Sequence, residues 1–400
     1  MRLLEGLKVL SVEQYGAGPF GTQYLGDLGA QVIKIENPKT GGDYARALGP
    51  YFIDGTEGSA SSLFFQSCNR NKKSLTLDIT DEKGRAIFHR LVKNADAVAN
   101  NLRGDVPEKL GLTYEALAAA NPAIICAHCS AYGREGPRKS WPGFDYLMQA
   151  ENGYFSLCGE PDGPPNRFGL SIVDYMGGLS MAFGIVSGIL AAKKSGIGRD
   201  VDVNLFDTAF FNLNYLGYWA MNADYFQERT ARSAHPSLTP CQLYKTADGW
   251  IYLMCNKENF WPKLCQLVDR EAWIEDERFK GFANRLQQRE HLTDLLDEAL
   301  STRTTEAWLE TFEGQIPAAP VMDLESTFKN PFVLSSERIQ ELEHQSGQTF
   351  KSMRAPIRST GDNEFDDRGA PELGEHTEYL LRELGLDEAE IEELKSAKTI

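Results

Sequence analysis

Short apolar runs recur along the first 130 residues, with amphipathic segments between them. The runs are five to eight residues long, the usual length of buried strands. They cover residues 7–12, 31–36, 74–79, 96–100 and 123–130. The segments 81–95, with Thr80 as its N-cap, and 112–121 are typical of helices. Strands and helices that alternate in this way predict an α/β fold with a parallel sheet wrapped by helices.

The pattern changes after this first part of the chain. Residues 145–225 indicate long helices interrupted by a strand at 201–206, and residues 238–255 indicate two strands joined by a turn at 247–249. A helical segment returns at 376–386. We therefore predict a large first domain, a smaller α+β domain and a C-terminal return segment. Their ranges are 1–225, 226–325 and 326–400.

Composition narrows the set of partners. The chain has 400 residues and a net charge of −16, which disfavours nucleic acid and anionic membranes. No basic segment followed by a long apolar one stands at the start, so we expect a cytoplasmic protein. The longest apolar stretch, 168–192, contains Asp174 and several glycines, and this favours a buried helix over a membrane span.

A glycine motif follows the first predicted strand. Gly16, Gly18 and Gly21 have the spacing G-x-G-x-x-G, and Glu36 ends the second strand twenty positions after Gly16. This is the fingerprint of a dinucleotide-binding turn, in which glycines allow the backbone to approach a pyrophosphate at a helix N-terminus. An NAD-dependent oxidoreductase is therefore one hypothesis.

A basic cluster precedes the third strand. Arg70, Lys72 and Lys73 lie within four positions of each other in an otherwise acidic chain. Such a cluster is either a solvated loop or a site for a ligand with several phosphates, where Lys supplies point charges and Arg a fork.

Asp174 also has two interpretations. A carboxylate at the start of a glycine-rich apolar helix is a common N-cap. The helix N-terminus would also keep it ionised while apolar neighbours remove its water, and these are the properties of a carboxylate nucleophile.

The cysteines and histidines do not indicate a metal site. Cys126 and Cys129 form a C-x-x-C, but they lie in a predicted strand, where residues three apart point to opposite faces. Two unpaired core thiols are the better interpretation. The six histidines show no ligand spacing, and we predict no metal.

These residues, together with four further motifs, resemble the class III CoA-transferases. The motifs are GREGP (133–137), GFDY (143–146), GIGRDVDVNLFD (196–207) and LGEHTEYLLRELGL (373–386). The family includes formyl-CoA, carnitine and dicarboxylate CoA-transferases and the α-methylacyl-CoA racemases, and the resemblance runs from Leu4 to about Leu394. It implies a Rossmann-like domain built from both chain ends, an inserted smaller domain and an interlocked homodimer.

The resemblance also implies a reaction. CoA passes from an acyl-CoA to a carboxylic acid through an aspartyl anhydride and an aspartyl-CoA thioester on Asp174, with no metal or tightly bound cofactor. Gly177 and Gly178 are candidates for stabilising an oxyanion. The residues matched to CoA binding are Ala17, Asn71, Lys72, Lys73, Asn101, Leu102, Lys109 and Lys139.

Departures from the family pattern bear on the substrate. Gly16 stands where formyl-CoA and oxalate enzymes have Gln, and no tetraglycine lid occurs between 225 and 320, which disfavours oxalate. Arg167 is a candidate for the distal carboxylate of a dicarboxylic acid such as succinate, although a surface salt bridge explains it equally well. Tyr15, Gly16 and Phe144 are further candidate substrate contacts.

The racemase alternative depends on one position. Similar racemases have a G-H-D motif whose histidine moves a proton, whereas this chain reads Gly143-Phe144-Asp145. Phenylalanine carries no proton, and His128 lies in a predicted strand, so CoA transfer is favoured over racemisation.

Overall fold

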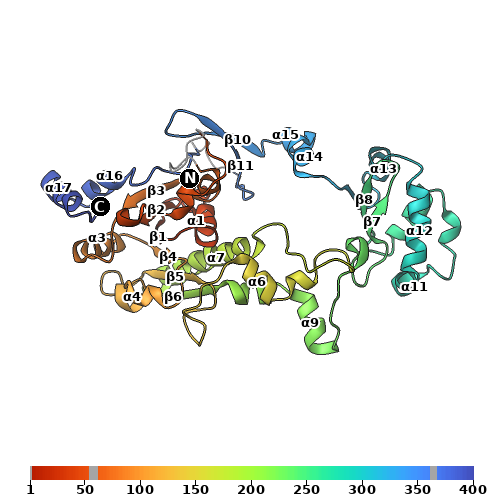
Figure 1. The fold of residues 1–400 in the computed structure, drawn as a ribbon, viewed down its shortest axis with the longest axis horizontal. Coiled ribbons are helices and arrows are strands. Elements are labelled where there is room, and N and C mark those ends of the chain that lie inside the picture. The colour runs from red at the N-terminus through yellow and green to blue at the C-terminus, as the bar shows by residue number, and fades with distance from the viewer. Residues whose placement is uncertain (1, 54–61, 361–366) are drawn as a thin grey trace. The chain divides into compact units, whose positions relative to one another are not determined.

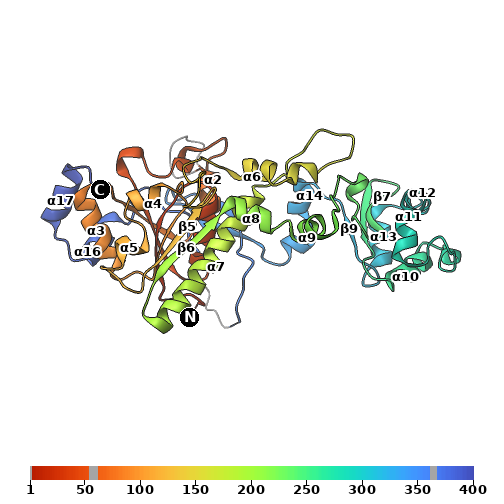
Figure 2. The same cartoon turned by 90° about the horizontal axis from the view of Figure 1, so that it is seen from below.

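The computed structural model describes residues 2–53, 62–360 and 367–400 (Figures 1 and 2). The chain divides into two compact units. Unit 1 consists of Met1–Asn152, Gly169–Asn214 and Glu337–Ile400, and unit 2 of Gly153–Phe168 and Tyr215–Ser336. Both chain ends therefore belong to unit 1.

Unit 1 is built on a six-stranded parallel sheet, which confirms the predicted α/β fold. The strand order is β3 (Lys72–Thr76), β2 (Gln31–Glu36), β1 (Lys8–Val12), β4 (Ala97–Asn100), β5 (Ile125–Ser130) and β6 (Arg199–Asn204). Leu10 pairs with Ile33 on one side and with Val98 on the other, and all three are fully buried. The strand order reverses between β1 and β4, where sheets of this type bind ligands.

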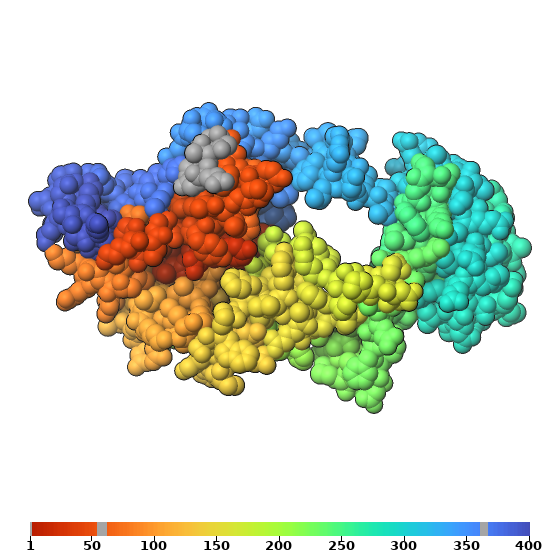
Figure 3. All heavy atoms as spheres, in the orientation of Figure 1, coloured from red at the N-terminus to blue at the C-terminus, as the bar shows by residue number. Residues whose placement is uncertain are grey.

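Helices cover the sheet. α1 (Ala17–Asp27) and α7 (Ile172–Ser195) pack together, and α7 also packs on β5 and β6. α3 (Glu82–Val92) shares a hydrophobic core with α16 (Thr377–Glu383) and α17 (Glu388–Ser396), so the C-terminal segment lies against the N-terminal part of the chain (Figure 3). The other helices of unit 1 are α2 (Leu63–Asn69), α4 (Val106–Lys109), α5 (Tyr114–Leu117), α6 (Asp145–Glu151) and α8 (Leu205–Phe211).

Unit 2 contains the predicted hairpin. β7 (Cys241–Lys245) and β8 (Trp250–Met254) are antiparallel, and β9 (Ala318–Pro320) pairs with β8. The helices of this unit are α9 (Asn214–Ala223), whose first residue belongs to unit 1, α10 (Phe260–Leu267), α11 (Gly281–Gln287), α12 (Arg289–Leu300), α13 (Thr305–Phe312), α14 (Leu324–Lys329) and α15 (Pro331–Leu334). A second hairpin, β10 (Ile339–Glu343) with β11 (Thr349–Met353), belongs to unit 1.

Some predicted boundaries were wrong. The third strand begins at Lys72 and not at residue 74, because Lys72 and Lys73 already pair with β2. The buried Lys72 ammonium is neutralised by Glu13. The N-cap of α3 is Asp81 and not Thr80. The Asp81 carboxylate accepts hydrogen bonds from the Lys83 and Gly84 amides, whereas the Thr80 hydroxyl donates to Asp78.

The predicted helix over 112–121 is also shorter than expected, since only the four residues of α5 are helical. The predictions for Cys126 and Cys129 are confirmed. Both are buried free thiols on β5.

The apolar helix α7 is buried on one face only. It is the one helix in the described chain that is long and apolar enough to cross a membrane by length and composition. Val173, Met181 and Ile185 are fully buried, whereas Phe183 and Leu190 on its outer face are exposed. The prediction of a buried helix therefore holds for the face that packs on the sheet.

The glycines of the G-x-G-x-x-G motif serve close packing of α1. A Cβ added at Gly21 would overlap the carbonyl oxygen of Gly178 on α7, and a Cβ at Gly18 would lie 2.8 Å from the Cβ of Asn101. The two helix backbones can approach this closely only without a side chain at Gly21. The Glu36 carboxylate is also used within the protein. Its oxygens accept hydrogen bonds from the Arg46 guanidinium, the Ser74 hydroxyl and the Asp43 backbone amide.

We expect Gly21→Ala to lower the free energy of unfolding by ~2 kcal/mol or more, because α1 and α7 must separate to admit the methyl group. Denaturant titration followed by circular dichroism measures this loss. Gly169→Ala is the matched control, since a Cβ at Gly169 meets no atom within 4 Å. Equal stability of the two variants would contradict the proposed role of this contact.

Candidate active site

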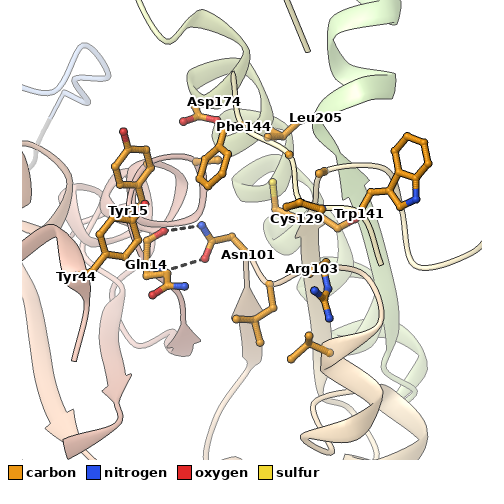
Figure 4. A pocket seen from close by; sticks show the side chains of 18 residues that line it. Gln14, Tyr15, Tyr44, Asn101, Arg103, Cys129, Trp141, Phe144, Asp174 and Leu205 are labelled. Carbon is orange, nitrogen blue, oxygen red and sulfur yellow. Dashed lines mark hydrogen bonds between the residues drawn. The ribbon is translucent and has the colours of Figure 1, made fainter. Parts of the chain in front are cut away.

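A cavity of about 450 Å³ lies at the carboxyl ends of β1, β4 and β5 (Figure 4). It coincides with the point where the strand order reverses. Its walls come from the loop after β1, the loop after β4, the end of β5 and the segment before α6. The lining residues are Gln14, Tyr15, Gly16, Ala17, Tyr44, Asn101, Leu102, Arg103, Val106, Cys129, Ser130, Ala131, Trp141, Pro142, Gly143, Phe144, Asp174 and Leu205.

Asp174 contributes the one carboxylate among the lining residues that the structure describes. It is the third residue of α7, whose N-cap is Ser171, so the interpretation of Asp174 as an N-cap is wrong. Its carboxylate points instead toward Gly16, and a Cβ at Gly16 would lie 2.5 Å from Oδ2. Glycine at position 16 therefore leaves the space that the carboxylate occupies.

Asp145 stabilises the start of α7 in place of Asp174. Its Oδ2 accepts hydrogen bonds from the amides of Val173, at 2.6 Å, and Asp174, at 2.9 Å. Gln149 donates to the other oxygen of Asp145, at 2.6 Å. The amides that were expected to keep the Asp174 carboxylate ionised therefore bind a different carboxylate.

The electrostatics of Asp174 follow from this arrangement. Its side chain is 6% exposed, and no residue in the described part of the chain donates a hydrogen bond to its carboxylate. Burial, with a smaller contribution from the nearby Asp145 carboxylate, raises the pKa of Asp174 to about 7. The result is a poorly hydrated carboxylate whose ionised form is available around neutral pH.

The loops after β1 and β4 are joined by a reciprocal pair of hydrogen bonds. The backbone N–H of Gln14 donates to Asn101 Oδ1, at 2.9 Å, and Asn101 Nδ2 donates to the backbone carbonyl oxygen of Gln14, at 2.7 Å (Figure 4). Gly18 provides the space for the Asn101 side chain. The strand order reverses between these two loops, so this pair fixes the width of the cavity at that point.

The cavity brings together seven of the residues predicted from the sequence. They are Asp174, Tyr15, Gly16, Ala17, Asn101, Leu102 and Phe144. Gln14, Tyr44, Arg103, Ser130 and Trp141 also line it but were not predicted. Gln14 and Arg103 adjoin predicted residues in the chain, whereas nothing local to Tyr44 or Trp141 marks them as part of this site.

The basic cluster lies outside the cavity lining. Lys72 is buried, its Nζ lies 2.8 Å from Glu13 Oε1, and burial lowers its pKa to about 8. Asn71 donates to Asp27 and Asp367, and the Lys73 ammonium lies 4.7 Å from the centre of the Tyr379 ring. The Lys72 charge is therefore matched inside the protein and has no open side for a phosphate.

The remaining predicted residues are spread over both units. Lys109 is exposed and lies 2.6 Å from Asp105, and Lys139 is exposed. Gly177 and Gly178 lie beyond the first four residues of α7. Backbone amides at such positions donate hydrogen bonds within the helix, so these two are poor donors to an oxyanion. Arg167 is exposed on unit 2 and donates to the Phe168 carbonyl oxygen. The substrate role of Arg167 stays a prediction.

Comparison with known proteins identifies the family. Residues 4–377 match the model of CoA-transferase family III. The chain belongs to this family. CoA-transferases from very different organisms align with it over almost its full length.

Three relatives illustrate the range. A succinate–glutarate CoA-transferase of Agrobacterium fabrum is 32% identical, covering 95% of both chains. The human succinyl-CoA:glutarate CoA-transferase is 34% identical over 99% of this chain and 90% of its own, and an acetyl-CoA:oxalate CoA-transferase of Acetobacter aceti is 33% identical over 96% of both. The oxalate enzyme is about as similar to this chain as the two glutarate enzymes are, so these comparisons do not disfavour oxalate.

Solved structures agree with the fold. A CAIB/BAIF family protein from Brucella suis superposes with a TM-score of 0.81 at 31% identity, covering 96% of this chain and 99% of that one. The Rv3272 protein of Mycobacterium tuberculosis gives a TM-score of 0.83 at 29% identity, covering 94% and 98%.

The raised pKa of Asp174 predicts a stability that depends on pH. Between pH 3.8 and about 7 the unfolded chain releases this proton while the folded chain retains it, so the free energy of unfolding falls as pH rises. We expect Asp174→Asn to be more stable than wild type by up to ~4 kcal/mol above the folded pKa, and to lose this advantage toward pH 4.

Urea titrations across this pH range measure the difference. Asp294→Asn serves as the control, because Asp294 is an exposed carboxylate on unit 2. A stability difference between Asp174→Asn and wild type that stays constant with pH would contradict the assigned environment of the carboxylate.

Proposed function

We propose that the protein transfers CoA from an acyl-CoA donor to a carboxylic acid acceptor, with Asp174 as the nucleophile. The observation that supports this most directly is a single, poorly hydrated carboxylate in a cavity at the strand-order reversal of the sheet. A carboxylate with little water around it is a better nucleophile than a solvated one, because less solvent must be displaced before attack. The names of the relatives support the same reaction class.

The proposed reaction has four acyl-transfer steps. The Asp174 carboxylate attacks the thioester carbonyl, forming a mixed anhydride and releasing CoA thiolate. The thiolate attacks the aspartyl carbonyl, forming an aspartyl-CoA thioester and releasing the donor acid. The acceptor carboxylate attacks this thioester, forming a second mixed anhydride and releasing CoA thiolate. The thiolate then attacks the acceptor acyl carbonyl of this anhydride, which gives the new acyl-CoA and the free Asp174 carboxylate.

The surroundings of Asp174 support each turnover. Gly16 leaves one face of the carboxylate open to the cavity, and Asp145 keeps the first turn of α7 in place. We assign the side of the cavity with Asn101, Leu102 and Ala17 to the thiol end of CoA, as the family resemblance implies. Lys73, Lys109 and Lys139 are the predicted cations left for the phosphates. Lys72 is buried against Glu13, whereas Lys109 remains exposed to solvent although it pairs with Asp105.

We also propose that the protein acts as an interlocked homodimer, as the family resemblance implies. Large apolar side chains on several helices are two-thirds or more exposed in the single chain. They include Phe183 on α7, Phe211 on α8, Leu324 on α14 and Phe332 on α15. A second copy of the chain would cover these side chains and remove their apolar surface from water.

Asp174→Ala is expected to abolish transfer, by a factor of about 10⁴ or more, because both covalent intermediates form on this carboxylate. The measurement follows new thioesters by mass spectrometry after mixing the enzyme with acyl-CoAs and free acids. Borohydride or hydroxylamine added after acyl-CoA should modify wild-type enzyme at Asp174, which peptide mapping detects. Asp294→Ala is the control, and near-normal turnover by Asp174→Ala would refute the assignment.

Racemisation of the acyl α-carbon is the alternative reaction, and Phe144 opposes it. The cavity places phenylalanine where the resemblance expects the histidine of a racemase, so a second proton carrier is missing on that side. We expect no deuterium at the α-carbon of a 2-methylacyl-CoA incubated with the enzyme in heavy water. Deuterium uptake that requires Asp174 but no acceptor acid would favour the racemase instead.

A further inference from the structure

Four aromatic side chains form an aromatic wall beside the cavity, and three of them, Tyr15, Tyr44 and Phe144, line it. This aromatic wall consists of Tyr15, Tyr44, Phe64 and Phe144. The Tyr15 ring stacks on Tyr44, with centroids 5.1 Å apart and planes at 11°, and it lies 5.0 Å from the Phe64 ring. Phe144 meets Tyr15 edge-on at 6.2 Å. Tyr15 is therefore the centre of the wall.

A buried ion pair fixes the backbone of Tyr15. Its φ is +69°, a left-handed conformation that a bulky residue seldom adopts. The Tyr15 amide donates to Asp43 Oδ1, at 3.1 Å, and the Asp43 carboxylate lies 2.9 Å from the Lys34 ammonium. Both charged side chains are fully buried, and Lys34 also donates to the Glu13 carbonyl oxygen. The Lys34–Asp43 pair thus holds the Tyr15 backbone, and with it the central ring of the wall, in place.

The wall lies beside the nucleophile. Tyr15 immediately precedes Gly16, which touches the Asp174 carboxylate, and Tyr44 and Phe144 line the same cavity as Asp174 (Figure 4). Tyr44 is 47% exposed and Phe144 is 55% exposed, and both residues line the cavity. The polar groups of Asn101 and Ser130 come from the loop after β4 and the end of β5.

The wall offers no positive charge to a ligand. Among the lining residues in the described part of the chain, Arg103 is the one cation, and its guanidinium bonds Asp105 at 2.6 Å. Burial raises the pKa of both Tyr15 and Tyr44, so their hydroxyls remain neutral. A second carboxylate placed against these rings would lose water without gaining an ion pair, which is unfavourable.

We propose that the aromatic wall selects an acid whose carboxylate reaches Asp174 and whose body is an aromatic ring or a bulky apolar group. This inference rests on the proposed CoA transfer. Ring-to-ring contacts with Tyr44 and Phe144 contribute binding beyond the burial of apolar area. Small aliphatic acids leave much of the aromatic wall uncovered, and dicarboxylic acids bring a second charged carboxylate against it. Both are therefore expected to bind less well.

An exchange assay tests the selection without knowledge of the natural partner acid. An acyl-CoA is incubated with its own isotopically labelled acid, and the transfer of label into the thioester is measured. Donor and acceptor acid are the same compound, so the equilibrium constant of the exchange is one for every pair and the rates can be compared directly. The pairs are phenylacetyl-CoA with phenylacetate, butanoyl-CoA with butanoate, and glutaryl-CoA with glutarate. We expect kcat/KM for phenylacetyl exchange to exceed that for glutaryl and butanoyl exchange by about tenfold or more.

Variants of the wall connect this preference to its residues. Tyr44→Leu and Phe144→Leu should each lower the ratio of phenylacetyl to butanoyl exchange by about threefold to tenfold. Trp250→Leu removes an exposed aromatic ring from β8 of unit 2 and is the control for loss of an aromatic side chain, with the ratio unchanged. A preference for glutarate or butanoate, or a ratio that neither wall variant changes, would overturn the inference.

A binding measurement separates this inference from the proposed function. Calorimetric titration compares the affinity of wild type and Phe144→Leu for phenylacetate and butanoate in the presence of CoA. Exchange that is absent for every pair, or that survives Asp174→Ala, refutes CoA transfer on Asp174. If phenylacetate then still binds more tightly than butanoate through Phe144, the wall retains its selectivity, and equal affinities would refute that as well.

Discussion

The contact between α1 and α7 is the constraint on which the site depends. Gly21 and Gly178 allow the two helix backbones to meet, and a side chain at Gly21 would force them apart. Because α1 begins directly after the loop that carries Tyr15 and Gly16, and α7 carries Asp174 in its first turn, the same contact places Gly16 against the carboxylate. A motif with the spacing of a dinucleotide-binding turn thus packs two helices beside the Asp174 carboxylate.

The helix N-terminus is used in an unexpected way. The amides at the start of α7 were expected to stabilise the charge of Asp174, but Asp145 accepts their hydrogen bonds. Asp145 therefore anchors the helix and adds negative charge close to Asp174, while burial removes water. Both effects raise the pKa of Asp174. The pKa of Asp174 therefore depends in part on a second carboxylate that holds the helix.

Buried ion pairs hold the segments beside the cavity in place. The pairs are Lys34 with Asp43, Lys72 with Glu13 and Arg46 with Glu36. Each links a strand to a loop at the carboxyl end of the sheet, and removing one partner would leave an uncompensated buried charge. The Asp43 carboxylate extends this order to the Tyr15 amide, so the position of the aromatic wall depends on a lysine in the core of the sheet.

Local patterns in the sequence determined the order of strands and helices, the β7–β8 hairpin and Asp174 as a candidate nucleophile, because each depends on residues that are near one another in the chain. The family resemblance added the reaction class. The tertiary structure alone decided how the polar groups are paired. Asp145 meets the Val173 amide across 28 positions, and Lys72 meets Glu13 across 59. The local sequence suggests that Lys72 is a surface cation, and only the fold shows that Glu13 lies beside it. Nothing in the sequence around Tyr44 indicates that it lines the same cavity as Asp174. A pattern over a few residues records which groups need a partner, but only the folded chain determines which partner is within reach.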